Sequence, residues 1–150
     1  DLGVPGPFVQ DNHSRSAGGT VRGLHIQTGR RPQAKLIRVL AGEIFDVAVD
    51  VRRGSPTFLR AYAATLSAEN FLQLYIPEGF AHGFAVLSEE ADIEYKCSAV
   101  YDRVSEIGIL WNDPEIGVSW PVSDPILSER DRGNPKLAEI LDRLPVYQAR

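Results

Sequence analysis

Polar side chains that could take part in chemistry occur inside segments that otherwise have the apolar pattern of β-strands. Arg22 and His25 lie in RGLHIQ, Asp46 and Asp50 lie in FDVAVD, and His82 lies in PEGFAHGF. Burying an imidazole or a guanidinium without a partner is costly, so a chain that does this repeatedly is expected to line a cavity. These segments therefore predict a ligand site.

His25 is the leading candidate for acid–base chemistry, because an imidazole can accept and return a proton near neutral pH. A histidine base works best when a carboxylate fixes its tautomer and supports the imidazolium. Asp46, Asp50 and Asp131 are the candidates for that partner, and the spacing alone leaves the choice among them open.

Two further residues could complete a reaction of this kind. Lys35 follows His25 after a loop, and its ammonium group could stabilise an enolate oxygen. Tyr95 stands at a strand position and could deliver a proton from the opposite side. Each residue also has a purely structural interpretation, with His25 in the core, Lys35 on the surface and Tyr95 lining a barrel. Their joint occurrence favours catalysis, although the spacing leaves both interpretations open.

The sequence lacks the usual pattern of a metal site in a β-barrel. Such sites combine an H-x-H pair with a carboxylate and a third histidine, but Gln27 stands where the second histidine is needed. There is also no cysteine pair and no H-E-x-x-H helix. We therefore predict no bound metal and no cofactor.

Short strands separated by turns dominate the predicted secondary structure, which is typical of an antiparallel sandwich or barrel. The predicted strands cover residues 36–40, 43–50, 58–66, 71–76, 81–87 and 92–98. A helix is predicted over residues 134–143, with Asn134 as cap and Pro135 at its first position, and a short turn over 127–131 with Ser128 as cap. The sequence predicts one all-β domain over residues 1–150 with a short C-terminal helical segment.

Composition narrows the class of protein. The chain has 150 residues and a formal net charge of −4, which argues against a general nucleic-acid binder. Its single cysteine, Cys97, excludes an intrachain disulfide and fits a reducing, cytoplasmic location. No apolar run approaches the ~18 residues needed to cross a bilayer, and no signal peptide is visible. Because the sequence starts at Asp1 and contains no methionine, we expect a segment to be missing upstream.

A series of motifs resembles the dTDP-4-dehydrorhamnose 3,5-epimerases. In chain order these are FVQDNHS from Phe8, RGLH from Arg22, QAKL from Gln33, GEIFDVAVD from Gly42, GSPT from Gly54, LSAEN from Leu66, IPEGFAHGF from Ile76, YK from Tyr95 and WNDP from Trp111. The resemblance runs to Asp131. It implies a metal-free cupin-type jelly-roll barrel, a homodimer, and conversion of dTDP-4-dehydro-6-deoxy-D-glucose to dTDP-4-dehydro-L-rhamnose in L-rhamnose biosynthesis.

The same resemblance implies roles for individual residues. His25 would be the base at C3 and C5, Asp131 its partner, Lys35 the group that meets the enolate charge, and Tyr95 the acid on the opposite face. The implied substrate-binding residues are Gln10, Asp11, Asn12, Arg22, His82, Tyr101, Glu106 and Arg130, with Tyr101 stacking on thymine.

The chain also departs from the family pattern. We expect it to lack the family's N-terminal segment, which carries a first strand and an arginine and a glutamate that hold the nucleotide. Val100 stands where many members have a second tyrosine, and Ile26 replaces a common phenylalanine. Three alternatives stay open: an enzyme of this fold that acts at C3 or C5 alone, a ketoisomerase, and a non-catalytic cupin that binds a sugar nucleotide.

Overall fold

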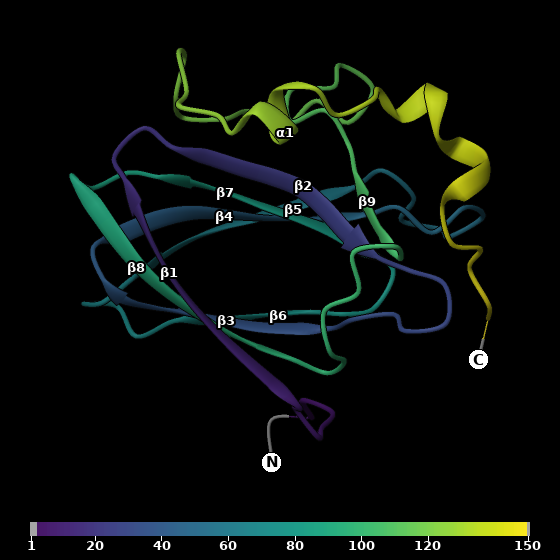
Figure 1. Ribbon diagram of the computed structural model, residues 1–150, viewed down its shortest axis with the longest axis horizontal. Coiled ribbons are helices and arrows are strands. Elements are labelled where there is room, and N and C mark those ends of the chain that lie inside the picture. The colour runs from purple at the N-terminus through teal and green to yellow at the C-terminus, as the bar shows by residue number, and fades with distance from the viewer. Residues whose placement is uncertain (1–2, 150) are drawn as a thin grey trace.

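Two antiparallel sheets face each other and form the layers of a jelly-roll barrel (Figure 1). The computed structural model describes residues 3–149. One sheet has the strand order β1–β8–β3–β6 and the other has the order β5–β4–β7–β2–β9. The strands are β1 (Gln10–Ala17), β2 (Val21–Gln27), β3 (Lys35–Ala41), β4 (Glu43–Asp50), β5 (Ala61–Ser67), β6 (Gln73–Ile76), β7 (Phe80–Val86), β8 (Glu90–Cys97) and β9 (Glu106–Gly108). The predicted all-β, cupin-type architecture is confirmed.

The hairpin of β4 and β5 shows how the sequence specifies a register. Glu43 pairs with Ser67 and the ladder continues to Val49 opposite Ala61, while the other edge of β4 pairs with β7. Because strand side chains alternate between faces, Val47 and Val49 point to one side of the sheet while Ile44 and Ala48 point to the other. β4 is therefore buried on both faces.

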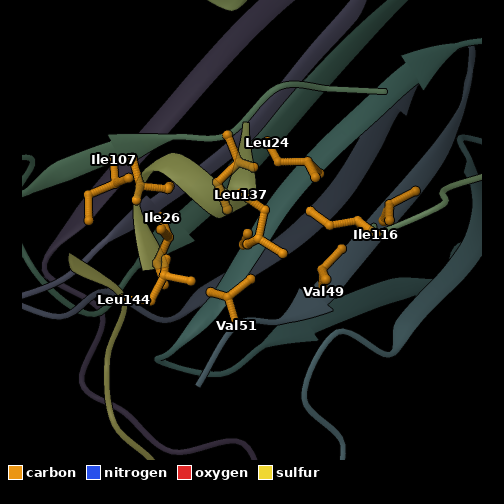
Figure 2. Close-up of a cluster of buried hydrophobic side chains, with 12 residues drawn as sticks. Leu24, Ile26, Val49, Val51, Ile107, Ile116, Leu137 and Leu144 are labelled. Atoms are coloured by element: carbon orange, nitrogen blue, oxygen red, sulfur yellow. The ribbon is translucent and has the colours of Figure 1, made fainter. Parts of the chain in front are cut away.

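Two apolar clusters lie on the two faces of the five-stranded sheet. One fills part of the space between the sheets and contains Ile37 and Ile93 from one sheet and Ile44 and Val86 from the other. The second covers the outer face, where Figure 2 shows Leu137 and Leu144 of the C-terminal segment beside Ile26 and Val51. The C-terminal segment thus closes the outer face and leaves the barrel interior free for a cavity.

The C-terminal helical segment differs in detail from the prediction. The predicted turn is a short α-helix, α1 (Glu129–Arg132), in which Ser128 caps the backbone N–H of Asp131 as expected. The predicted helix over 134–143 is instead two 3₁₀ helices, η1 (Leu137–Glu139) and η2 (Leu141–Arg143). Ile140, with φ −129°, interrupts the helical path between them. Burying Leu137, Ile140 and Leu144 in the outer cluster outweighs the local preference for a continuous helix.

None of the helices in residues 3–149 is both long and apolar enough to cross a membrane.

Candidate active site

A polar cavity of about 340 Å³ opens between the two sheets. Both sheets, α1 and the loop before β9 contribute to its lining: Gln10, Asn12, Arg22, His25, Gln27, Gln33, Lys35, His82, Phe84, Tyr95, Tyr101, Glu106 and Arg130. Of the predicted site residues, only Asp11 and Asp131 are not on its wall. The structure therefore brings together residues from distant parts of the sequence.

Of the three candidate carboxylates, Asp131 is the one that pairs with His25. Nε2 of His25 is 2.5 Å from Oδ1 of Asp131, which is 2% exposed. Burial alone would raise the pKa of Asp131, but the hydrogen bond and charge of His25 and the backbone N–H of Gly23 bring it below its usual value. An ionised carboxylate only accepts hydrogen bonds, so Nε2 donates and the Nδ1 lone pair of His25 is left for another group.

Residues on either side of α1 hold this carboxylate in place, and β9 leaves room for one of them. Asn134 donates to Oδ1 of Asp131 at 3.3 Å, and Ser128 accepts from the Asp131 backbone N–H at 3.0 Å. Gly108, which lies opposite His25 in the β2–β9 ladder, makes room for Asn134, since a Cβ there would lie 2.1 Å from the Asn134 Oδ1. The carboxylate is thus fixed from several directions.

A second histidine–aspartate pair lies beside the first on the same sheet. His82 is opposite His25 in the β2–β7 ladder, and its Nε2 is 2.6 Å from Oδ1 of Asp46 on β4. Burial lowers the pKa of His82, and the charges of Lys35 and His25 also lower it, while Asp46 acts in the opposite direction. Asp46, one of the candidate partners of His25, therefore pairs with His82 instead.

Lys35 and Tyr95 approach the cavity from the opposite, four-stranded sheet. The Lys35 Nζ lies 5.9 Å from the centroid of the Tyr95 ring. Burial lowers the pKa of Lys35, although Cys97, Glu106 and Asp46 partly offset this shift. Burial raises the pKa of Tyr95, so its phenol stays protonated at neutral pH and can donate.

Three polar side chains form a cluster at the cavity. The Oε2 of Glu106 accepts a hydrogen bond from the Tyr101 hydroxyl at 2.8 Å and another from Nη2 of Arg130 at 2.6 Å. Burial alone would raise the pKa of Glu106, but these two bonds bring it below its usual range. Gln10 accepts from the Tyr101 backbone N–H at 2.8 Å. Tyr101 is therefore held at its backbone and at its hydroxyl group, although the residue is 47% exposed.

The alternation of β1 separates the three residues predicted to hold the nucleotide. Gln10 and Asn12 point into the cavity and are bonded to each other at 3.0 Å. Asp11 points outward, where it accepts from Lys96 Nζ at 3.0 Å. A binding role for Asp11 stays a prediction, and in this structure Asp11 is not part of the cavity wall.

Arg22, on β2, also lines the cavity, and its Nε donates a hydrogen bond to the Ser16 hydroxyl at 3.0 Å.

Three cavity residues were not among the predicted site residues: Gln27, Gln33 and Phe84. Gln27 joins three loop backbones, donating to Arg31 and Val100 and accepting from Asp102 N–H at 2.9 Å. Its position on the same strand as His25, two residues on, is the sequence signal that would have found it. Where a metal site would need a histidine, this chain has an amide that shapes the loop carrying Tyr101. Among residues 3–149, no three His, Cys, Asp or Glu side chains are arranged to hold a metal ion.

Known proteins resemble this chain over nearly its whole length. A protein of Shigella flexneri named dTDP-4-dehydrorhamnose 3,5-epimerase is 53% identical over 132 residues, which cover 88% of this chain and 73% of the relative. A Streptomyces niveus protein named dTDP-4-dehydrorhamnose 3-epimerase is 39% identical over 148 residues, which cover 97% of this chain and 72% of the relative.

Solved structures and a family model agree with these relatives. The crystal structure of dTDP-6-deoxy-D-glucose-3,5-epimerase from Legionella pneumophila Philadelphia 1, in complex with dTDP-4-keto-L-rhamnose, is similar with a TM-score of 0.93 and 50% identity, covering 99% of this chain and 79% of that one. The family model described as dTDP-4-dehydrorhamnose 3,5-epimerase matches residues 1–139. The chain therefore belongs to the dTDP-4-dehydrorhamnose 3,5-epimerase family.

Proposed function

We propose that this protein is a dTDP-4-dehydrorhamnose 3,5-epimerase, an isomerase that converts dTDP-4-dehydro-6-deoxy-D-glucose to dTDP-4-dehydro-L-rhamnose. The relatives' names support this activity, as does the product bound in the Legionella enzyme. We also propose that it works as a homodimer in the cytoplasm, without a metal or cofactor, and that it binds neither nucleic acid nor membrane.

The observation that carries the proposal is the placement of base and acid on opposite walls. His25 lies on β2 in the five-stranded sheet, whereas Tyr95 lies on β8 in the four-stranded sheet, and both line the same cavity. A sugar ring between the sheets presents one face to each residue. Inversion of a carbon requires a proton to leave from one face and another to arrive at the opposite face, and this arrangement meets that requirement.

The chemistry follows from the acidity of the C3 and C5 protons, which are both next to the C4 ketone. Nδ1 of His25 takes the proton, and the electrons of the broken C–H bond form an enolate whose negative charge lies on the C4 oxygen. Asp131 stabilises the resulting imidazolium through Nε2, at 2.5 Å. The Tyr95 hydroxyl then protonates the same carbon from the other face, the ketone reforms, and both groups regain their starting protonation from solvent.

Lys35 is placed to stabilise the enolate. No described carboxylate forms an ion pair with its ammonium group, and it shares a wall of the cavity with Tyr95. A preorganised positive charge beside the C4 oxygen favours the charged intermediate over the neutral ketone. Lys35 can thus stabilise the enolate during the inversion at C3 and during the inversion at C5, without transferring a proton itself.

The cluster of Tyr101, Glu106 and Arg130 has the side chains needed to bind the base and the phosphates of the nucleotide. The Tyr101 ring offers a flat surface for a base, and the Arg130 guanidinium can reach phosphate oxygens. Because Glu106 already orders both side chains in the free protein, little conformational entropy is lost when the nucleotide binds.

The test is turnover of dTDP-4-dehydro-6-deoxy-D-glucose in deuterated water, with the product trapped by a coupled reductase and analysed by NMR. The proposal expects deuterium at both C3 and C5 in a product inverted at both centres. Label and inversion at C3 alone would place the protein with activities like that of the Streptomyces niveus relative, which is named a 3-epimerase. Absence of label at both carbons would reject an epimerase.

A further inference from the structure

Asp46 has surroundings that a carboxylate rarely occupies. It lies on β4 between Ile44 and Ala48, which belong to the apolar cluster between the sheets, and it is completely buried. Phe84, its partner in the β4–β7 ladder, belongs to the same cluster. Burying an ionised group at such a place costs considerable free energy unless a paired charge and hydrogen bonds offset the lost hydration.

The hydrogen bonding of Asp46 is incomplete. Its Oδ1 lies 2.6 Å from Nε2 of His82, but Oδ2 has no hydrogen-bond partner among the described residues and is buried. By contrast, Asp50 on the same strand accepts from Arg52, Ser55 and Thr57, with both oxygens engaged. Among the described residues, the bond to His82 is therefore the one hydrogen bond of the Asp46 side chain, and the charge of Lys35 also acts on this carboxylate.

This bond determines what His82 can offer to the cavity. A carboxylate accepts but cannot donate, so the imidazole proton must be on Nε2 and Nδ1 must carry a lone pair. His82 lines the cavity, and no group among the described residues bonds to its Nδ1. Burial and the positive charges of Lys35 and His25 lower the pKa of His82, so it remains a neutral imidazole at neutral pH.

We propose that Asp46 is a positioning residue of the epimerase, which holds His82 as the neutral Nε2–H tautomer so that Nδ1 accepts a hydrogen bond from a hydroxyl of the sugar ring. This inference rests on the proposed function. Because His82 is opposite His25 in the β-ladder, a hydroxyl held by His82 fixes the ring next to the base. His25 and His82 then have different tasks, proton transfer and orientation.

The tautomer can be measured without any activity. In protein labelled with ¹⁵N at histidine, the two ring nitrogens of a neutral imidazole have well separated chemical shifts. The His82 signals are assigned by their loss in the His82→Asn variant. The proposal expects His82 to carry its proton on Nε2 at pH 7, and a proton on Nδ1 would overturn it. If the wild type has the Nε2–H tautomer but no epimerase activity, the proposed function is rejected while the hydrogen-bond assignment survives.

The Asp46→Asn variant tests the consequence. The amide NH₂ is expected to face Nε2 of His82, because its oxygen can then occupy the place of the unpartnered Oδ2, whereas the reverse orientation would bury two unpaired N–H donors. The His82 proton should move to Nδ1, and kcat/KM should fall about 10- to 100-fold, the size expected for one hydrogen bond in a buried polar network.

Asp50→Asn is the matched control, since it replaces another buried carboxylate of β4 that does not line the cavity. It should lower stability but leave the His82 tautomer and the kinetic constants unchanged. Unchanged kcat/KM in Asp46→Asn, or an equal loss in both variants at a temperature where both are folded, would overturn the positioning role.

Discussion

The two histidine–aspartate pairs of the cavity differ in what surrounds the carboxylate. Asp131 lies on α1 and faces β2, where Gly23 and His25 donate to it, and Asn134 donates to it as well. Asp46 lies in the apolar interior with His82 as its one hydrogen-bond partner in the described chain. Both aspartates bind Nε2 of their histidine, so any difference in chemistry between the two pairs must come from the groups that surround them.

That difference suits the two pairs to different tasks. The His25 side chain is 23% exposed and its carboxylate is well supported by hydrogen bonds, so an imidazolium can form there during the reaction. The His82 side chain is 9% exposed, and Lys35 and His25 both disfavour a second positive charge beside them. Similar pairs in one cavity can therefore act as a base and as a fixed hydrogen-bond acceptor.

The largest expected effect is that of removing the base. His25→Ala should reduce deuterium uptake at both C3 and C5 by about 10²–10⁴-fold, the usual contribution of a general base. Calorimetry with dTDP should show that nucleotide binding survives. His13→Ala is the control, because His13 lies on β1 with a side chain 58% exposed and does not line the cavity. Retained exchange in His25→Ala would assign the base elsewhere, with His82 as the first candidate.

Removing the acid should separate exchange from inversion. Tyr95→Phe keeps the ring and deletes the hydroxyl, so His25 can still remove and return a proton on its own face. We expect deuterium exchange to continue while formation of the inverted product falls by about 10²-fold or more. Tyr62→Phe, on the exposed part of β5, should have no effect. If Tyr95→Phe forms the inverted product at the wild-type rate, Tyr95 is a packing residue.

Asp50 provides a third carboxylate for the comparison, one that stabilises the fold. Arg52 and two hydroxyl groups bond to it and, against the effect of burial, lower its pKa below the ordinary value of 3.8. Because the pKa of Asp50 is lower in the folded state than in the unfolded state, the ionised carboxylate stabilises the fold. This stabilisation is fully present above pH 3.8 and is lost as the pH falls through the lowered pKa of the folded state. Asp50→Asn should therefore cost about 3 kcal/mol of unfolding free energy at pH 7, measured by urea denaturation, with kcat unchanged. A cost that is equal at pH 7 and pH 3 would contradict this account.

Period-2 patterns in the sequence predicted the strands best where one or both faces are apolar. The predicted strand 43–50 has the bounds of β4, and β3, β7 and β8 differ from their predictions by a few residues. β1 was not predicted, because QDNHSRSA has no apolar alternation. The structure gives the reason: Gln10 and Asn12 of its inner face line a polar cavity. A strand that forms a binding site lacks the signal by which strands are recognised.

The site was predictable in part from the residues and more fully from the family resemblance. Burial of His25 and His82 within strands indicated a cavity, which is present. The choice of Asp131 over Asp46 and Asp50 depends on how α1 docks on β2, and no local pattern specifies that contact. The outward position of Asp11 follows from strand alternation once β1 is known. Strand alternation could have placed Gln27 in the cavity, but its bonds to three loop backbones and the proposed role of Asp46 depend on hydrogen-bond geometry and needed the structure.

The alkaline limb of the pH–rate profile should report the charge on Lys35. Burial lowers the pKa of Lys35 below its ordinary value of 10.5, whereas burial raises the pKa of Tyr95 above its ordinary value of 10.0. We expect kcat to decline below pH 10.5 while circular dichroism shows a folded protein. Lys35→Arg, which keeps its charge at high pH, should move the decline upward. A kcat that stays constant up to pH 10.5 would show that the charge of Lys35 does not support the enolate.

The smallest expected effect is in the cluster of Tyr101, Glu106 and Arg130, which we propose binds the nucleotide and call the nucleotide cluster. Arg130→Ala removes a side chain that is 49% exposed and bonded to Glu106, while His25, Asp131 and Tyr95 keep their places. The loss of one charge-assisted hydrogen bond to phosphate should raise KM about tenfold and leave kcat nearly constant. Arg132→Ala is the control, since Arg132 lies on the same helix and outside the cavity. A fall in kcat at constant KM would mean that Arg130 acts on the reaction through Glu106, so that the nucleotide cluster and the catalytic pairs form one electrostatic unit rather than two separable regions.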